Sequence, residues 1–163
     1  MGRRLALIAI IIVISYALYN ATMDKNITKR VANRTEAVED SKQKALYRDE
    51  LAKIDDIEYS REYIIDVINQ GSNKLSFKGG VMEGGYISST DAPTLACYVL
   101  ALSKKVELSS CPQEASMFYS SVCGGCHGDD GRGIHGTYPD LTRDRLLGVS
   151  HREEWLRAKL RQK

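Results

Sequence analysis

Cys123, Cys126 and His127 stand in the spacing Cys-Gly-Gly-Cys-His. Two thiols separated by two residues can add across the vinyl groups of a haem and so fix the porphyrin to the chain. The adjacent histidine is then placed to reach the iron as its proximal ligand. The spacing therefore predicts one covalently attached haem c, and Gly124 and Gly125 leave room for the edge of its ring.

The cysteines of this chain are compatible with two other kinds of site. A Cys-Gly-Gly-Cys pair is also typical of thioredoxin-type redox proteins, but no βαβ pattern surrounds it and His127 would have no role. Together with Cys97 and Cys111 the pair could form a four-cysteine zinc site, but these two are not spaced as structural zinc ligands usually are. Cys97 and Cys111 could instead form a disulfide, or Cys97 could be a buried free thiol, and the sequence leaves both open.

The segment around the motif resembles a known family. Residues 123–133 read Cys-Gly-Gly-Cys-His-Gly-Asp-Asp-Gly-Arg-Gly, and residues 138–142 read Tyr-Pro-Asp-Leu-Thr. Both stretches resemble the first half of class I cytochrome c. The resemblance is closest to domains in the c-type haem subunits of cbb3-type oxidases and in small membrane-bound respiratory cytochromes.

This resemblance implies roles for individual residues. Cys123 and Cys126 are the expected thioether attachments, and His127 is the expected proximal ligand. Pro139 is the expected source of the carbonyl that accepts the other N–H of His127 and so fixes its tautomer. Tyr138 is expected to cover the haem edge, with ordinary core packing as the alternative.

The second half of the family pattern is not downstream of the motif. A class I domain continues to a methionine that serves as the sixth haem ligand, whereas no Met follows Cys126 in this chain. Similar pieces lie upstream: residues 60–70 resemble the middle helix, Gly79-Gly80-Val81-Met82 the Met loop, and residues 94–102 the closing helix. The family usually has Pro after that Met, whereas Glu83 stands here.

Two architectures fit this order of segments. In the first, residues 72–104 complete the haem domain in permuted order and Met82 binds the iron. In the second, residues 41–104 are a degenerate duplicated domain, and residues 111–163 are a truncated haem domain that is open or covered by a partner chain. Because an apolar haem face normally finds cover from water, the first architecture is favoured. The alternatives to Met82 as sixth ligand are His135, His151 and an open position.

The elements that position these residues are predicted to be helices, and no clear strand pattern appears. A helix that opens near Pro112, with Ala115, Phe118 and Val122 on its apolar face, leads into the haem motif. The predicted fold is mostly α, a cytochrome c-like helical haem domain. Residues 45–108 form a cytochrome c-like half or a degenerate domain, and residues 109–163 the haem-attachment region.

The N-terminal segment predicts a location. No charged residue stands between Arg4 and Asp24, and 19 uncharged residues would span roughly 28 Å as a helix. Residues 1–23 are therefore predicted to be a transmembrane helix, with a cleaved signal peptide as the alternative. Residues 24–44 are predicted to be a polar tether. This predicts an inner-membrane protein whose haem domain faces the periplasm.

Charge and haem chemistry together narrow the function. The chain has 163 residues, with 23 Lys and Arg against 21 Asp and Glu, and this near balance does not favour nucleic acid as a partner. The expected function is that of an electron carrier and not of an enzyme. Its expected partner is a respiratory complex, such as a cytochrome bc1-type complex or a cbb3-type oxidase. The alternatives are a haem sensor with an open sixth position and a structural haem subunit.

Overall fold

The structure is a computed structural model that describes residues 2–162. The chain divides into two compact units, Met1–Leu46 and Tyr47–Lys163. The first unit is formed by most of helix α1 (Gly2–Lys53). Apart from Lys44, every side chain described in that unit is exposed. The core that positions the haem motif therefore lies in the second unit.

The N-terminal transmembrane helix is a prediction that the structure overturns. No helix among the residues described is both long enough and apolar enough to cross a membrane. The prediction for residues 1–23 is therefore wrong, and Met1 lies outside the described residues. The uncharged run does not form a separate apolar element: it is the first part of α1, which continues past Asp24 through many Lys, Arg, Asp and Glu residues.

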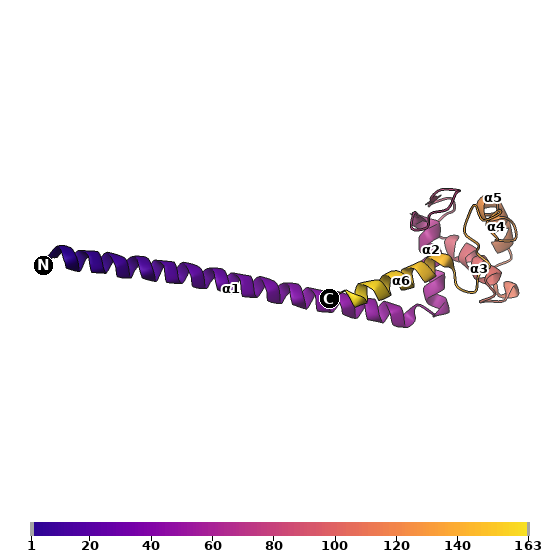
Figure 1. Cartoon of the computed structure of the whole chain (residues 1–163). Helices are drawn as coiled ribbons and strands as arrows, with labels where there is room; N and C mark the ends of the chain where they lie inside the picture. Colours follow the sequence, from indigo (N-terminus) through magenta and orange to yellow (C-terminus); the bar gives the residue numbers. More distant parts are fainter. Residues whose placement is uncertain (1, 163) are drawn as a thin grey trace. The chain divides into compact units, whose positions relative to one another are not determined.

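The second unit is built mostly from helices, whose order is shown in Figure 1. After the end of α1 come α2 (Ile57–Gln70) and α3 (Ala92–Leu102), and then the 3₁₀ turn η1 (Leu108–Ser110). The remaining helices are α4 (Ala115–Val122), α5 (Gly124–His127) and α6 (Leu147–Arg161). Two short strands, β1 (Gly71–Ser72) and β2 (Met82–Glu83), form an antiparallel pair that the sequence did not predict, because two residues are too few to show an alternating pattern.

The centre of the core is α3. Its sequence is apolar around most of its circumference, as expected of a helix with neighbours on several sides. Leu95 and Leu100 have no exposed surface. The helix packs against α2 on one side and α4 on another. At the α4 contact, the rings of Tyr98 and Tyr119 stack with their centroids 4.7 Å apart.

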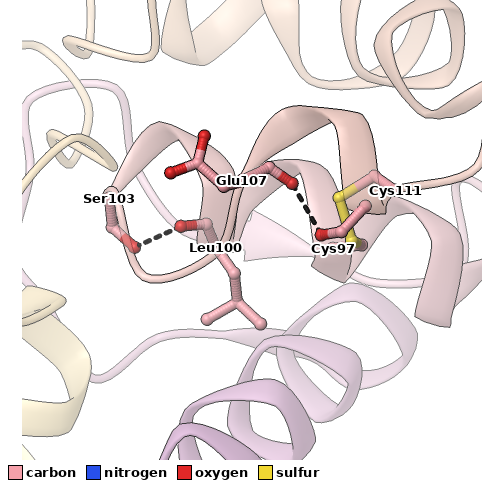
Figure 2. Close-up of a disulfide and its surroundings, with 6 residues drawn as sticks. Cys97, Leu100, Ser103, Glu107 and Cys111 are labelled. Carbon is pink, nitrogen blue, oxygen red and sulfur yellow. Dashed lines mark hydrogen bonds between the residues drawn. A yellow bond between two sulfur atoms is a disulfide. The ribbon is translucent and has the colours of Figure 1, made fainter.

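A disulfide joins α3 to the segment that precedes α4. Cys97 and Cys111, which the sequence left as either bonded or free, are linked, with their Cα atoms 5.7 Å apart (Figure 2). In the same view the hydroxyl of Ser103 donates to the carbonyl of Leu100 at 2.9 Å, closing the end of α3. The disulfide therefore ties the connection between α3 and α4 back onto α3. These are the two helices that meet at Tyr98 and Tyr119.

Helix α6 is attached to the last part of α1 and to the start of α2. The guanidinium of Arg152 donates two hydrogen bonds to Glu50, at 2.8 and 2.7 Å, and Tyr59 donates a third at 2.8 Å. The same guanidinium lies 4.4 Å from the centre of the Trp155 ring, which meets Tyr47 edge-on at 5.2 Å. This two-pronged pairing is the geometry in which an arginine–carboxylate contact is strongest.

The Glu50→Gln variant is expected to lose about 1 kcal/mol of unfolding free energy near neutral pH. Hydrogen bonds from Arg152 hold the pKa of Glu50 below its ordinary value of 4.5. Because the folded pKa lies below the unfolded one, this stabilisation is present above about pH 4.5 and is lost as the pH falls through the folded pKa. The difference between wild type and variant should therefore shrink in acid, as measured by chemical denaturation followed by circular dichroism.

A matched control for this prediction is Glu58→Gln. Glu58 also pairs with an arginine, Arg61, at 3.2 Å, but its side chain is 65% exposed and the pair lies within one helix. It should therefore change stability little at any pH. A loss in Glu50→Gln that stays the same at neutral and acidic pH would contradict the assigned role of the Glu50 charge.

Candidate haem site

The haem motif forms one helical turn that continues from α4. The backbone N–H of Cys123 donates to the carbonyl of Tyr119 at 2.8 Å, and that of His127 donates to the carbonyl of Cys123 at 2.8 Å. Residues bonded in this way lie one above the other on the same face of a helix. Cys123 and His127 are accordingly both buried, whereas Cys126 is exposed.

The imidazole of His127 is held in one tautomer. Its Nδ1 lies 3.0 Å from the carbonyl oxygen of Pro139, and because a carbonyl can only accept, Nδ1 carries the proton and donates. The lone pair of the neutral ring is therefore on Nε2. Burial lowers the pKa of His127, an effect that the bond to Pro139 opposes, so the neutral ring is favoured. A neutral imidazole with a fixed Nδ1–H is the state that binds a metal through Nε2.

The loop after the motif brings Pro139 back to His127. The N–H of Gly133 donates to the carbonyl of His127 at 2.7 Å, and the N–H of Tyr138 donates to the carbonyl of Gly133 at 3.0 Å. Gly133 has a φ of +77°, and a Cβ placed on it would lie 2.0 Å from the backbone oxygen of Tyr138. Glycine is required there both for its backbone conformation and for this close approach.

The two alternative sites for these cysteines do not fit the structure. Cys97 and Cys111 are bonded to each other and cannot serve as thiolate ligands to zinc. Burial raises the pKa of Cys123 to about 11, which disfavours the thiolate that a redox-active Cys123 would need. Within the part of the chain that the structure describes, no group of three or more His, Cys, Asp or Glu side chains could hold a metal ion.

A cavity of about 350 Å³ opens beside the motif. Its volume falls within the range of ligand-binding pockets, and most of its wall is apolar. The wall draws on both halves of the second unit's sequence: α2, the Met82 loop and α3 from the first half, and α4, α5 and the segments 138–141 and 146–148 from the second. Residues that are far apart in the sequence thus line the same cavity.

Met82 reaches this cavity from a loop that is fixed at its base. Strand β2 pairs with β1 directly after α2, so that Met82 lies opposite Ser72. The N–H of Gly85 also donates to the carbonyl of Ile68 in α2, at 3.0 Å. Met82 is half-buried, and its thioether is a soft donor of the kind that haem iron accepts.

The cavity brings together the site residues that the sequence singled out. Its lining includes Cys123, Cys126, His127, Tyr138, Pro139 and Met82. The two other candidate ligands are not part of it: His135 lies exposed in a turn with a φ of +53°, and His151 lies exposed on α6. An imidazole, a thioether and two thiols around one mostly apolar cavity are a donor set that fits haem c.

Two contacts at this site were not predicted from the sequence. Tyr119 is fully buried, and its hydroxyl donates to the carbonyl of Gly128 at 2.9 Å, which fixes the end of α5. The sequence signal for this role was that Tyr119 precedes Cys123 by one helical turn and so lies on the same helix face. Gly79 meets Tyr138 across the chain, and no sequence pattern indicates a contact between segments so far apart.

Comparison with known proteins gives a partial likeness. The cbb3-type cytochrome c oxidase subunit CcoP of Helicobacter pylori strain 26695 is 35% identical over 77 residues, covering 45% of this chain and 27% of that protein. The same subunit from strain 52 is also 35% identical over 77 residues, with 26% of its length covered. This chain therefore spans about a quarter of these relatives. No family model matches the chain, and no solved structure matches it.

This likeness supports a cytochrome c-like relationship of the respiratory type. It agrees with the chemistry of the cavity, where the attachment motif and the donors face one space.

Proposed function

We propose that this protein is a respiratory c-type cytochrome that carries electrons through one haem c. Cys123 and Cys126 would attach the haem, with His127 and Met82 as axial ligands. The observation that carries the proposal is the shared cavity, which Met82 lines together with all three residues of the motif. On this proposal the second unit completes its own haem domain in permuted order, with the Met side preceding the attachment motif along the chain.

The chain's own residues suit electron transfer without bond making or breaking. When bound, the haem supplies reversible one-electron chemistry at its iron. His127 is held by Pro139 on one side, and Met82 is held by the β1–β2 pair on the other, so neither ligand needs to move. Apolar walls limit access of water, and a methionine ligand favours the reduced state, which raises the potential.

We further propose that the carrier exchanges electrons with a respiratory complex, such as a cytochrome bc1-type complex or a cbb3-type oxidase, or is a subunit of one. Similarity to a subunit of a cbb3-type oxidase supports this class of partner. The disulfide between Cys97 and Cys111 supports a periplasmic location for the haem unit, because disulfides persist in oxidising compartments.

Production of the full chain together with a c-type haem-attachment system tests this function. The expected product carries one covalent haem, is reduced by a bc1-type complex with quinol, and is oxidised by a cbb3-type oxidase. It should bind carbon monoxide slowly and weakly, because Met82 fills the sixth position. Failure to exchange electrons with both complexes would overturn the electron-carrier function, and rapid, tight binding of carbon monoxide would favour a sensor with an open site.

A further inference from the structure

Gly79 and Tyr138 meet across the chain at the cavity. The N–H of Gly79 donates to the carbonyl of Thr137 at 3.0 Å. A Cβ built on Gly79 would lie 2.2 to 2.6 Å from three carbons of the Tyr138 ring, closer than real Cβ contacts occur. Glycine is thus what allows the backbone to lie directly against the ring.

This contact joins the loop that carries Met82 to the loop that holds the imidazole of His127. Gly79 lies in the loop that ends at Met82. Tyr138 lies directly before Pro139, whose carbonyl holds the imidazole of His127. The ring of Tyr138 is tilted against that imidazole, with centroids 6.2 Å apart. A shift of either loop would therefore change the distance between the two ligand side chains.

The backbone ties between the Met82 loop and the end of α2 hold the loop at its base. Its base is tied to the end of α2 through the two-residue ladder and through the bond from Gly85 to Ile68. Both of these lie at or after Met82 in the chain. In the stretch before Met82, the N–H of Gly79 makes the backbone hydrogen bond to the loop that leads to Pro139.

We propose that Gly79 and Tyr138 are positioning residues that hold the Met82 loop closed over the cavity. This inference rests on the proposed function and deepens it, because it names what keeps the sixth ligand in place. The ring of Tyr138 supplies a flat surface, and the missing side chain at Gly79 lets the loop reach it. Met82 would then be in place to bind the iron without a separate closing movement.

A double-mutant cycle with imidazole as the probe tests this proposal, because imidazole can replace a methionine ligand only when the loop opens. In the ferric holoprotein, Gly79→Ala should raise the affinity for imidazole roughly tenfold or more, since the added methyl group displaces the loop. In a Tyr138→Ala background the same change should have less than about a threefold effect, because the ring is absent. Tyr138→Phe keeps the ring and should leave the effect of Gly79→Ala intact.

An equal effect of Gly79→Ala with and without the Tyr138 ring would overturn the proposal, and so would no effect in either background. Hydrogen exchange at the amide of residue 79 gives a readout that does not depend on the ligand. Protection in the wild type and its loss in Gly79→Ala would support the contact, and equal exchange would overturn it. A wild type with covalent haem but no Met-to-iron absorption band would refute Met82 as ligand, and the exchange result would still decide the contact.

Discussion

Replacing Met82 with alanine is expected to abolish the Met-to-ferric-iron charge-transfer absorption band and to lower the reduction potential. Met82 is the methionine that the cavity brings to the same space as His127. Loss of its thioether removes a soft ligand that favours the reduced iron. Carbon monoxide should then bind the ferrous protein rapidly. Absorption spectra and a redox titration of the wild type and the variant measure all three effects.

The matched control is Met117→Ala. Met117 lies on α4, close to the motif in sequence, but its side chain is 59% exposed and does not line the cavity. The band and the potential should stay as in the wild type. If Met82→Ala keeps the band, Met82 is not the ligand, and the proposed completion of the haem domain within the chain loses its main support.

Replacing Tyr119 with alanine is expected to cost about 4 kcal/mol of unfolding free energy, the typical loss for a large aromatic side chain in a core. Tyr119 has no exposed surface, stacks on Tyr98, and donates a hydrogen bond to the carbonyl of Gly128. Its loss leaves a cavity between α3 and α4 and frees the end of α5. Guanidinium denaturation of the holoprotein, followed by circular dichroism, measures the cost.

The Tyr119→Phe variant separates packing from hydrogen bonding. It keeps the ring stacked on Tyr98 but removes the hydroxyl, and the expected loss is about 1 kcal/mol. The carbonyl of Gly128 is then left without this donor. A loss in Tyr119→Ala no larger than that in Tyr119→Phe would contradict the assigned packing role of the ring.

The chemistry of the attachment motif was accessible from sequence because it depends on neighbours in the chain. The spacing of Cys123, Cys126 and His127 fits within one helical turn, and a helix preceding it was predicted from its apolar face. That face was assigned to Ala115, Phe118 and Val122, whereas Tyr119 is the fully buried aromatic residue of α4. Periodicity indicates a helix more reliably than it indicates which side chain its neighbours cover.

Sequence alone gave a wrong or undecided prediction in two places: the N-terminal helix and the pairing of Cys97 with Cys111. The uncharged N-terminal run predicted a transmembrane helix, but within the described residues it is part of a long helix whose later residues are charged. The disulfide between Cys97 and Cys111 could not be decided from sequence, because it depends on the path that the chain takes after α3.

By itself, the sequence determined the attachment motif, the helical character of the chain and the residues that could serve as ligands. Only the tertiary structure decided which of these residues share a cavity: Met82 and His127 both line it, whereas His135 and His151 do not. The physical reason is that a motif is fixed by local backbone geometry, whereas a second axial ligand is set by loop closure and packing between α2, α3 and α4. Those contacts join residues far apart along the chain.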